Sequence, residues 1–323
     1  MIEVKHISKR FRTPLVPEGR FAGVRALFSR KYKEKVAVDD ISFCIGQGEF
    51  VGYIGPNGAG KSTTIKMLTG ILHPSTGEVA IGGRSPHRDR RHVVRGLGVV
   101  FGQRTQLWWD LPTRDSYDIL AAMYKLRERD KARKLAEMND LLGLGEFMDT
   151  PVRKLSLGQR MRADLAAALL HDPAILFLDE PTIGLDVIAK KNIRGFLKTI
   201  NRELGKTILL TTHDMDDIEE LCQRVMVINH GRLAYDGSIP DLRSRIGLPT
   251  VIRVSFREPL PERLETDGAP FSIAGRNGLE LTLQCNRQDI PAMDVLRHVS
   301  QWGEIADVHM EEPAFEEIIH KVY

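Results

Sequence analysis

The stretch GPNGAGKST, Gly55 to Thr63, decides the fold of this chain of 323 residues. It follows the apolar run FVGYI at 50–54 and opens a run with helical spacing, the context in which a glycine-rich loop binds phosphate. Glycines let backbone N–H groups approach phosphate oxygens, and the N-terminus of the following helix adds its dipole. The sequence therefore predicts a phosphate-binding loop between a buried strand and a helix.

Two side chains of this loop suggest separate roles in nucleotide binding. We expect the Lys61 ammonium to contact the β- and γ-phosphates of a bound nucleotide and the Ser62 hydroxyl to bind Mg²⁺. A glycine-rich turn without a ligand is the alternative, and the flanking strand and helix argue against it. The loop residues expected to contact the nucleotide are Gly55, Asn57, Gly58, Gly60, Lys61, Ser62 and Thr63.

Two further apolar runs end in side chains suited to phosphate chemistry. AILFLDEPTIGLD, at 174–186, leads into Asp179, expected to hold the Mg²⁺ shell, and Glu180, expected to polarise the water that attacks the γ-phosphate. Two adjacent carboxylates after an apolar run are costly to bury unless they meet a cation. TILLTTHDM, at 207–215, reaches His213, a candidate contact to the γ-phosphate. A histidine there is more often structural when it stands alone, but beside the other two motifs the contact with phosphate is favoured.

The pattern of the chain indicates an α/β fold with two domains. β-branched apolar runs that alternate with helical spacing predict a parallel sheet covered by helices. The segment at about 106–170 has helical spacing only, which predicts a helical subdomain inserted in a first domain at 1–237. Strands are expected at 50–54, 97–101, 174–179, 207–212 and 224–229.

A change of pattern after residue 237 predicts a small α+β domain at 238–323. Its order of elements is strand, helix, hairpin, helix, strand, with the turn signal Asn277-Gly278 in the hairpin. The first of these helices is expected in PLPERLE, at 259–265. This split βαβ pattern is of the ferredoxin-like type.

Composition excludes several classes of protein. With 46 basic and 43 acidic residues, the formal net charge of +3 gives no argument for nucleic-acid binding. The three cysteines are too few and too far apart for a disulfide framework or a metal site. No apolar run approaches the roughly 18 residues that span a bilayer, and the charged start MIEVKHISKRFR is no signal peptide. We therefore expect a chain that neither crosses a membrane nor is exported.

With both phosphate motifs in place, residues 1–237 resemble the ATP-binding cassette (ABC) ATPases. LSLGQ, at 155–159, is similar to that family's signature, in which Ser156, Gly158 and Gln159 would bind the γ-phosphate of ATP held by a second cassette. Leu157 departs from the usual glycine, and its Cβ would restrict approach of the backbone to phosphate. An ordinary N-cap of a helix is the alternative role for the serine.

The resemblance implies further site residues. Gln103 resembles the loop glutamine that approaches Mg²⁺ and takes part in catalysis, although the spacing leaves Gln106 as a competitor. Asp186 matches the loop aspartate after the acidic strand. The aromatic that stacks on adenine is Tyr32 or Phe11, and the spacing of YKEKVAVDDISF favours Tyr32. The implied fold is that of a P-loop NTPase with a RecA-like parallel core and an antiparallel β edge.

Two surfaces are unusual for a minimal cassette. Residues 12–31 form an insertion that is basic and carries apolar residues at helical spacing. It is expected to lie against the anionic inner leaflet or a membrane partner, and packing on its own cassette is the alternative. QLWWDLP, at 106–112, places Trp108 and Trp109 where related cassettes receive their transmembrane subunit; burial in the helical subdomain is the alternative.

The resemblance implies an ATP-hydrolysing subunit of an ABC-2 type exporter, with ATP and Mg²⁺ as ligands. Its expected partners are a second cassette and transmembrane permease subunits, with no nucleic acid, and its expected place is cytoplasmic, on the inner face of the cell membrane. The competing interpretation is a cassette ATPase that acts on ribosomes or DNA. A phosphate-loop kinase is a further alternative, but it leaves LSLGQ unexplained.

Overall fold

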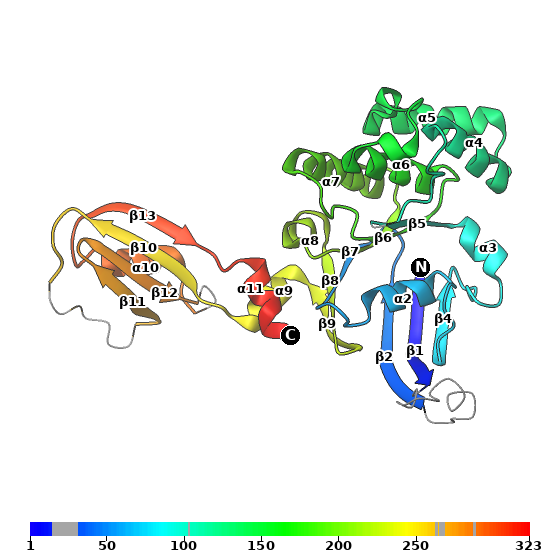
Figure 1. The fold of residues 1–323 in the computed structure, drawn as a ribbon. Helices are drawn as coiled ribbons and strands as arrows, with labels where there is room; N and C mark the ends of the chain where they lie inside the picture. Colours follow the sequence, from blue (N-terminus) through cyan, green and yellow to red (C-terminus); the bar gives the residue numbers. More distant parts are fainter. Residues whose placement is uncertain (15–31, 103, 262–263, 265–268, 287–288) are drawn as a thin grey trace, which may run out of the picture. The chain divides into compact units, whose positions relative to one another are not determined.

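The computed structural model describes residues 1–14, 32–102, 104–261, 264, 269–286 and 289–323 (Figure 1). The chain divides into two compact units, Met1–Asp236 and Gly237–Tyr323. The border lies one residue before the one expected from the sequence.

The core of the first unit is a sheet with the strand order β5-β6-β7-β3-β8-β9. Its pairs β5 with β6, β6 with β7, β7 with β3 and β3 with β8 are parallel. Every residue of β3 and β7 is buried, which matches strands that are covered on both faces. The five strands expected from the sequence are all present. The strands are β3 (Phe50–Ile54), β5 (Leu97–Phe101), β6 (Ile175–Asp179), β7 (Thr207–Thr211), β8 (Arg224–Asn229) and β9 (Arg232–Ser238).

An antiparallel sheet forms the expected β edge, with the order β2-β1-β4. Its strands are β1 (Ile2–Pro14), β2 (Tyr32–Ile45) and β4 (Thr76–Ile81). The helix that follows the glycine-rich loop, α2 (Lys61–Leu68), shares one apolar cluster with both sheets; Ile41 of β2, Ile65 of α2 and Phe177 of β6 are all members with no exposed surface. This packing holds α2 between the two sheets, so the loop before it cannot shift freely.

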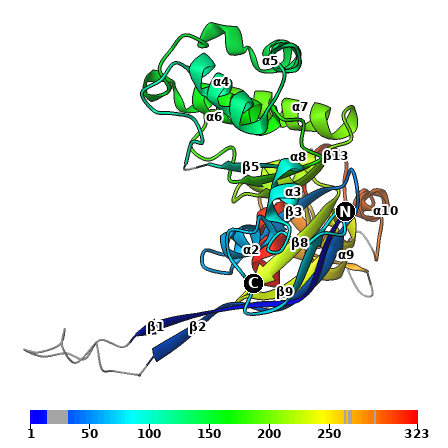
Figure 2. The same ribbon diagram turned by 90° about the vertical axis from the view of Figure 1, so that its right-hand side faces the viewer.

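The helical subdomain comprises α4 (Thr113–Tyr124), α5 (Glu128–Leu142) and α6 (Leu157–Leu169), with two short 3-10 turns between α5 and α6. The three helices gather at one end of this unit, beyond β5 and β6 (Figures 1 and 2). The alanine-rich face of α6 is buried, and the Tyr117 hydroxyl of α4 donates to the Ala163 carbonyl at 3.2 Å. The remaining helices of the first unit are α3 (Arg90–Arg95), α7 (Val187–Arg202) and α8 (Met215–Leu221).

The second unit contains an antiparallel sheet in the order β11-β12-β10-β13. Its first and third strands along the chain are neighbours in the centre, as a ferredoxin-like sheet requires, and Gly278 turns the hairpin with φ +59°. The helix expected at 259–265 falls largely outside the described residues. The elements are α9 (Ile239–Ile246), β10 (Thr250–Phe256), β11 (Phe271–Asn277), β12 (Glu280–Cys285), α10 (Ala292–Val299), β13 (Ile305–Glu311) and α11 (Phe315–Val322).

Among the described residues, none of the helices has both the length and the apolar composition needed to cross a bilayer.

Candidate functional site

The glycine-rich loop lies between β3 and α2, and two of its glycines are required by close backbone contacts. A Cβ on Gly55 would lie 2.2 Å from the Ile228 carbonyl oxygen, and one on Gly60 would lie 2.4 Å from the Ala37 carbonyl oxygen. Gly60 also has φ +112°, a conformation that favours glycine. The loop is therefore pressed against β8 and β2, which fixes its backbone at the start of α2.

Lys61 is the buried cation of this loop, with 7% of its surface exposed. Its ammonium donates to the carbonyl oxygens of Gly55 at 2.5 Å and Pro56 at 3.2 Å. Burial lowers the pKa of Lys61, while the nearby Glu180 and Asp179 carboxylates act in the opposite direction. The positive charge thus faces both the loop and the acidic end of β6.

Asp179 joins the acidic strand to the glycine-rich loop. Its Oδ1 accepts a hydrogen bond from the Thr211 hydroxyl at 2.5 Å, and its Oδ2 accepts one from the Ser62 hydroxyl at 3.3 Å. β6, β7 and α2 therefore bring a carboxylate and two hydroxyls together at the carboxyl edge of the parallel sheet, where ligands of such sheets bind.

Glu180 and His213 meet beside Asp179. The Glu180 carboxylate lies 3.1 Å from Nε2 of His213, although the two residues come from different strand ends. Glu180 has φ +56°, and its N–H donates to the Thr211 carbonyl at 2.8 Å. A residue other than glycine in this conformation is held there by its surroundings and is common at functional sites. The structure thus places Glu180 and His213 together, as their sequence positions suggested.

A pocket of about 340 Å³ opens at this edge. Gln103 lies outside the described residues, but its neighbours Gly102 and Arg104 line the pocket. A Cβ on Gly102 would lie 2.1 Å from the Glu180 carbonyl oxygen, so the residue before Gln103 must be glycine. Arg104 is a lining cation that sequence reasoning missed. The full lining is Ser62, Lys66, Ile71, Phe101, Gly102, Arg104, Asp179 and Glu180.

Gln106, the alternative to Gln103, is hydrogen-bonded to Asp164 of α6. Its side-chain amide donates to the Asp164 carbonyl at 3.0 Å, and its backbone N–H donates to Oδ1 of the same residue at 3.1 Å. It does not line the pocket. The structure therefore gives Gln106 a structural role in the helical subdomain.

Ser156 is the N-cap of α6 and takes part in a complete capping box. Its hydroxyl oxygen accepts from the Gln159 N–H at 3.1 Å, and its own N–H donates to the Gln159 side chain at 3.0 Å. A Cβ on Gly184 would lie 3.0 Å from Leu157 Cδ2, so the leucine side chain packs against the loop after β6. Ser156 is thus the N-cap of α6 and is exposed, and its expected contact with the nucleotide of a second cassette stays a prediction.

Gly158 and Asp186 lie on neighbouring helix starts. A Cβ on Gly158 would lie 3.4 Å from the Cβ of Ala189, so α6 begins beside α7. Asp186 is the N-cap of α7, and its carboxylate accepts from the Ala189 N–H at 2.8 Å. None of these residues lines the pocket at the glycine-rich loop.

The two aromatic candidates for adenine differ in their position along the β1–β2 hairpin. Phe11 pairs with Lys35, and Tyr32 pairs with Pro14 at the far end of the strands. Ala37 marks the level of the loop, because its carbonyl contacts Gly60. Along β2, Lys35 opposite Phe11 lies two residues from Ala37, and Tyr32 lies five residues from it. At a rise of about 3.3 Å per residue, these separations are about 7 Å and about 17 Å. By this measure Phe11 lies nearer the level of the loop than Tyr32, which the spacing favours, and the residue that stacks on adenine stays a prediction.

The two tryptophans lie on the surface. Trp108 is 37% and Trp109 is 50% exposed, so burial in the helical subdomain does not describe them. The Arg160 guanidinium lies 5.9 Å from the Trp109 ring centroid. The basic insertion at 12–31 falls almost entirely outside the described residues.

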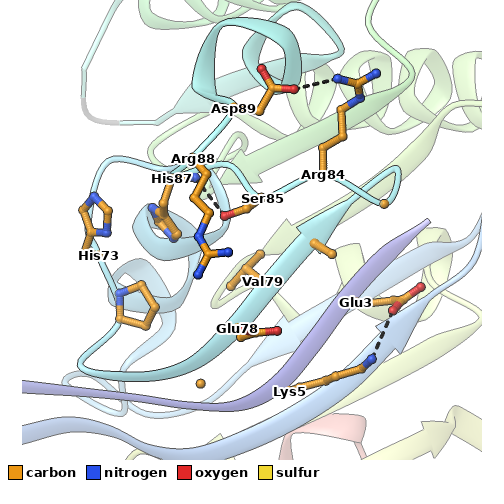
Figure 3. Close-up of a pocket in the computed structure, with 14 residues that line it drawn as sticks. Glu3, Lys5, His73, Glu78, Val79, Arg84, Ser85, His87, Arg88 and Asp89 are labelled. Carbon is orange, nitrogen blue, oxygen red and sulfur yellow. Dashed lines mark hydrogen bonds and ion pairs between the residues drawn. The ribbon is translucent and has the colours of Figure 1, made fainter.

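A larger pocket, of about 550 Å³, lies on the antiparallel sheet and the loop after β4 (Figure 3). Its charges are largely balanced by the ion pairs of Arg84 with Asp89 and of Lys5 with Glu3. It contains none of the residues expected to bind nucleotide. Three of the residues expected to act on phosphate or Mg²⁺, namely Ser62, Asp179 and Glu180, line the smaller pocket instead.

A glycine-rich loop that leads from a buried strand into a helix, beside an acidic strand end in a parallel sheet, defines a P-loop nucleoside triphosphatase. Comparison with known proteins identifies the family. The profile of the family described as "ABC transporter" matches residues 38–183. The ABC transporter ATP-binding protein NatA of Bacillus subtilis is 34% identical over 215 residues, which are 67% of this chain and 87% of the relative.

Other relatives and solved structures agree. The Nod factor export ATP-binding protein I of Burkholderia thailandensis is 37% identical over 75% of this chain and 79% of its own length. A structure described as the ATP-binding subunit of an ABC transporter superposes with a TM-score of 0.63 and 26% identity, over 76% of this chain and 93% of that chain. A dimeric post-hydrolysis structure of the cassette MJ0796 with ADP and Pi superposes with a TM-score of 0.62 and 25% identity, over 74% of this chain and 99% of that chain. The chain belongs to the ATP-binding cassette family of transporter ATPases, as an ATP-hydrolysing subunit.

Proposed function

We propose that this chain drives export through separate transmembrane subunits by hydrolysing ATP between two cassettes. The observation that carries the proposal is the meeting of Ser62, Asp179, Glu180 and His213 at one edge of the parallel sheet. The relatives named for Nod factor export and for linearmycin resistance support the direction of transport. The substrate path would lie in the other subunits.

The donor set at the sheet edge fits Mg²⁺. The Ser62 hydroxyl oxygen and Oδ2 of Asp179 already lie 3.3 Å apart. Mg²⁺ is a hard cation that binds oxygen ligands and takes few of them from the protein. Bound Mg²⁺ would neutralise charge on the phosphates of ATP. We propose Ser62 and Asp179 as its ligands, with Gln103, outside the described residues, as a third.

Glu180 and His213 would act on the attacking water and the γ-phosphate. The Glu180 carboxylate is 21% exposed, close enough to the pocket to orient a water, and His213 lies at 3.1 Å on its other side. We infer that His213 fixes the carboxylate and contacts the γ-phosphate. Lys61 and the loop N–H groups would hold the phosphates, and Phe11 or Tyr32 would stack on adenine.

A second cassette would complete the site. The Ser156 oxygen accepts its capping hydrogen bond, and a hydroxyl also carries one proton to donate, so capping leaves a donor for a phosphate of the partner cassette. Gly158, Gln159 and the loop residue Asp186 are proposed to lie at the same interface. Because these residues do not reach the pocket of their own chain, a head-to-tail pair accounts for both sets.

The exposed indoles of Trp108 and Trp109 are proposed to receive a transmembrane subunit. Both are large apolar groups on the helical subdomain, one of them under the Arg160 guanidinium. Aromatic residues and arginine are enriched where proteins associate. The cassette would then lie in the cytoplasm, peripheral on the inner face of the cell membrane.

A pull-down tests the proposal. Tagged Glu180→Gln, expected to retain bound ATP, is purified from gently solubilised membranes with ATP and Mg²⁺, and its companions are identified by mass spectrometry. An integral membrane protein in equal amount is the expected result, with Trp109→Ala in the same background as the matched variant that loses it. Ribosomal proteins or DNA-associated factors without a membrane protein would overturn the transporter role and favour the ribosome or DNA alternative.

A further inference from the structure

A buried acid lies beneath the Glu180–His213 pair. Asp217, on α8, has no exposed surface, and a carboxylate is among the most costly groups to bury without partners. α8 packs against α7 and follows the end of β7 (Figure 1). The position of this carboxylate therefore needs an explanation from its contacts.

One oxygen of Asp217 joins the two segments that carry the pair. Oδ2 accepts from the Thr182 hydroxyl at 2.5 Å and from the Thr212 hydroxyl at 3.0 Å. Thr182 follows Glu180 by two residues, and Thr212 directly precedes His213. Both threonines are almost fully buried, at 2% and 3% exposed, so water does not replace these bonds.

The other oxygen of Asp217 is held by an arginine of α7. Nε of Arg194 donates to Oδ1 at 2.5 Å, and its Nη2 donates to Asp214 at 3.1 Å. The Thr212 hydroxyl in turn accepts from the Asp214 N–H at 3.0 Å. The carboxylate is thus paired and oriented, as a buried charge must be to be tolerated.

We propose that Asp217 is a positioning residue for hydrolysis, which fixes the separation of Glu180 and His213 through Thr182 and Thr212. The inference rests on the proposed roles of Glu180 and His213. Catalytic geometry tolerates little displacement, and a misplacement of about 1 Å can lower turnover about 100-fold. Because a single carboxylate oxygen accepts from both segments, a displacement of one segment is expected to displace the other.

Steady-state kinetics of the full-length chain tests the proposal. Thr182→Val removes one hydroxyl at nearly constant volume, and we expect kcat to fall about 10- to 100-fold with KM for MgATP changed less than about twofold. Thr182→Ser restores the hydroxyl and is expected to restore kcat. The matched control is Thr113→Val, which removes the hydroxyl bond of a fully buried threonine to the Thr150 carbonyl in the helical subdomain and should leave kcat unchanged.

Hydrogen exchange read by mass spectrometry measures the coupling without turnover. We expect Thr182→Val to raise exchange in both 177–184 and 209–216, and Thr182→Ser to raise it in neither. Exchange raised in 177–184 alone, or kcat unaffected by Thr182→Val, would overturn the proposal. Folded Asp217→Asn should also show raised exchange in both 177–184 and 209–216, as Thr182→Val does.

A double variant separates this inference from the proposed function. In the Glu180→Gln background, Thr182→Val should lower the residual hydrolysis by a much smaller factor than in the wild type, because part of its effect is exerted through the Glu180 carboxylate. An additional loss equal to that in the wild type contradicts the proposal. If Glu180→Gln alone leaves hydrolysis unchanged, the role of Glu180 is wrong, while the exchange experiment still reports whether the two segments are coupled.

Discussion

Asp164→Asn should stabilise this protein at neutral and higher pH. Asp164 lies on the buried face of α6, with 4% of its surface exposed. Burial raises the pKa of its carboxyl to about 6, although hydrogen bonds from Thr105 at 2.8 Å and Gln106 at 3.1 Å act to lower it. The asparagine oxygen can accept the same two bonds without carrying a charge.

The magnitude follows from the two pKa values. The pKa of Asp164 rises from an ordinary value of 3.8 to about 6, and each pKa unit corresponds to about 1.4 kcal/mol, so ionisation costs the folded state about 3 kcal/mol. Because the folded pKa is the higher one, the folded state binds more protons across this window. The wild type therefore loses stability as pH rises from about 4 to about 6, and the cost stays constant above that.

Urea unfolding followed by tryptophan fluorescence measures this effect. Trp108 and Trp109 report on the same subdomain, and a Trp302→Phe background removes the signal of the second unit. We expect the free energy of unfolding of Asp164→Asn to exceed that of the wild type by up to about 3 kcal/mol at pH 8 and by about 1.5 kcal/mol at pH 5. Any cost of leaving the asparagine amide N–H unpaired reduces both differences. If the variant is the less stable protein by a similar amount at both pH values, the ionised carboxylate stabilises the fold and the reasoning is refuted.

Asp172, just after α6, provides a control because the pKa of its carboxyl is shifted in the opposite direction from that of Asp164. Burial acts to raise its pKa, but hydrogen bonds and ion pairs with Lys206 and Lys134 outweigh this and hold the pKa below its ordinary value. Its stabilising contribution is present above an ordinary value of 3.8 and is lost only as pH falls below it. Asp172→Asn should therefore be less stable than the wild type by the same amount at pH 8 and pH 5.

Three further predictions concern nucleotide. Lys61→Ala should weaken ATP binding at least about tenfold in equilibrium titration, because it removes the cation that faces the phosphates; unchanged affinity would contradict the loop assignment. Ser156→Asp keeps an N-cap oxygen but adds a negative charge, so thermal melting should be unchanged while hydrolysis is lost, whereas Ser156→Ala should cost about 1 kcal/mol of stability. Phe11→Ala should reduce ATP affinity more than Tyr32→Ala; the reverse order would restore the spacing argument.

Much of the site could be predicted from the sequence because its signals are local. Apolar runs that end in Asp179 and His213 are enough to place both at one edge of a parallel sheet, since parallel strands end on the same side. Gly60 needs a positive φ, and Ser156 begins a helix whose third residue is Gln159. Each of these features lies within a few residues of the chain.

Other parts depend on contacts between distant segments. The level of Phe11 and Tyr32 relative to the loop is decided by the pairing register of β1 and β2, which is shifted by irregularities between Val4 and Arg10 of β1. The spacing leaves Gln106 as a competitor of Gln103, and only the packing of α6 shows that the Gln106 side-chain amide donates to the Asp164 carbonyl. No local pattern marks either contact.

Local sequence is enough to specify the P-loop core, the acidic strand end and the N-cap of α6, because backbone conformation and hydrophobic periodicity depend on neighbouring residues. Three other features depend on how distant segments pack: Asp217 reaches Thr182 and Thr212, Gly102 lies against Glu180, and Ser156 does not line the pocket of its own chain. The physical reason is that side-chain contacts between segments far apart in the chain depend on strand order and helix packing, which the whole fold sets at once.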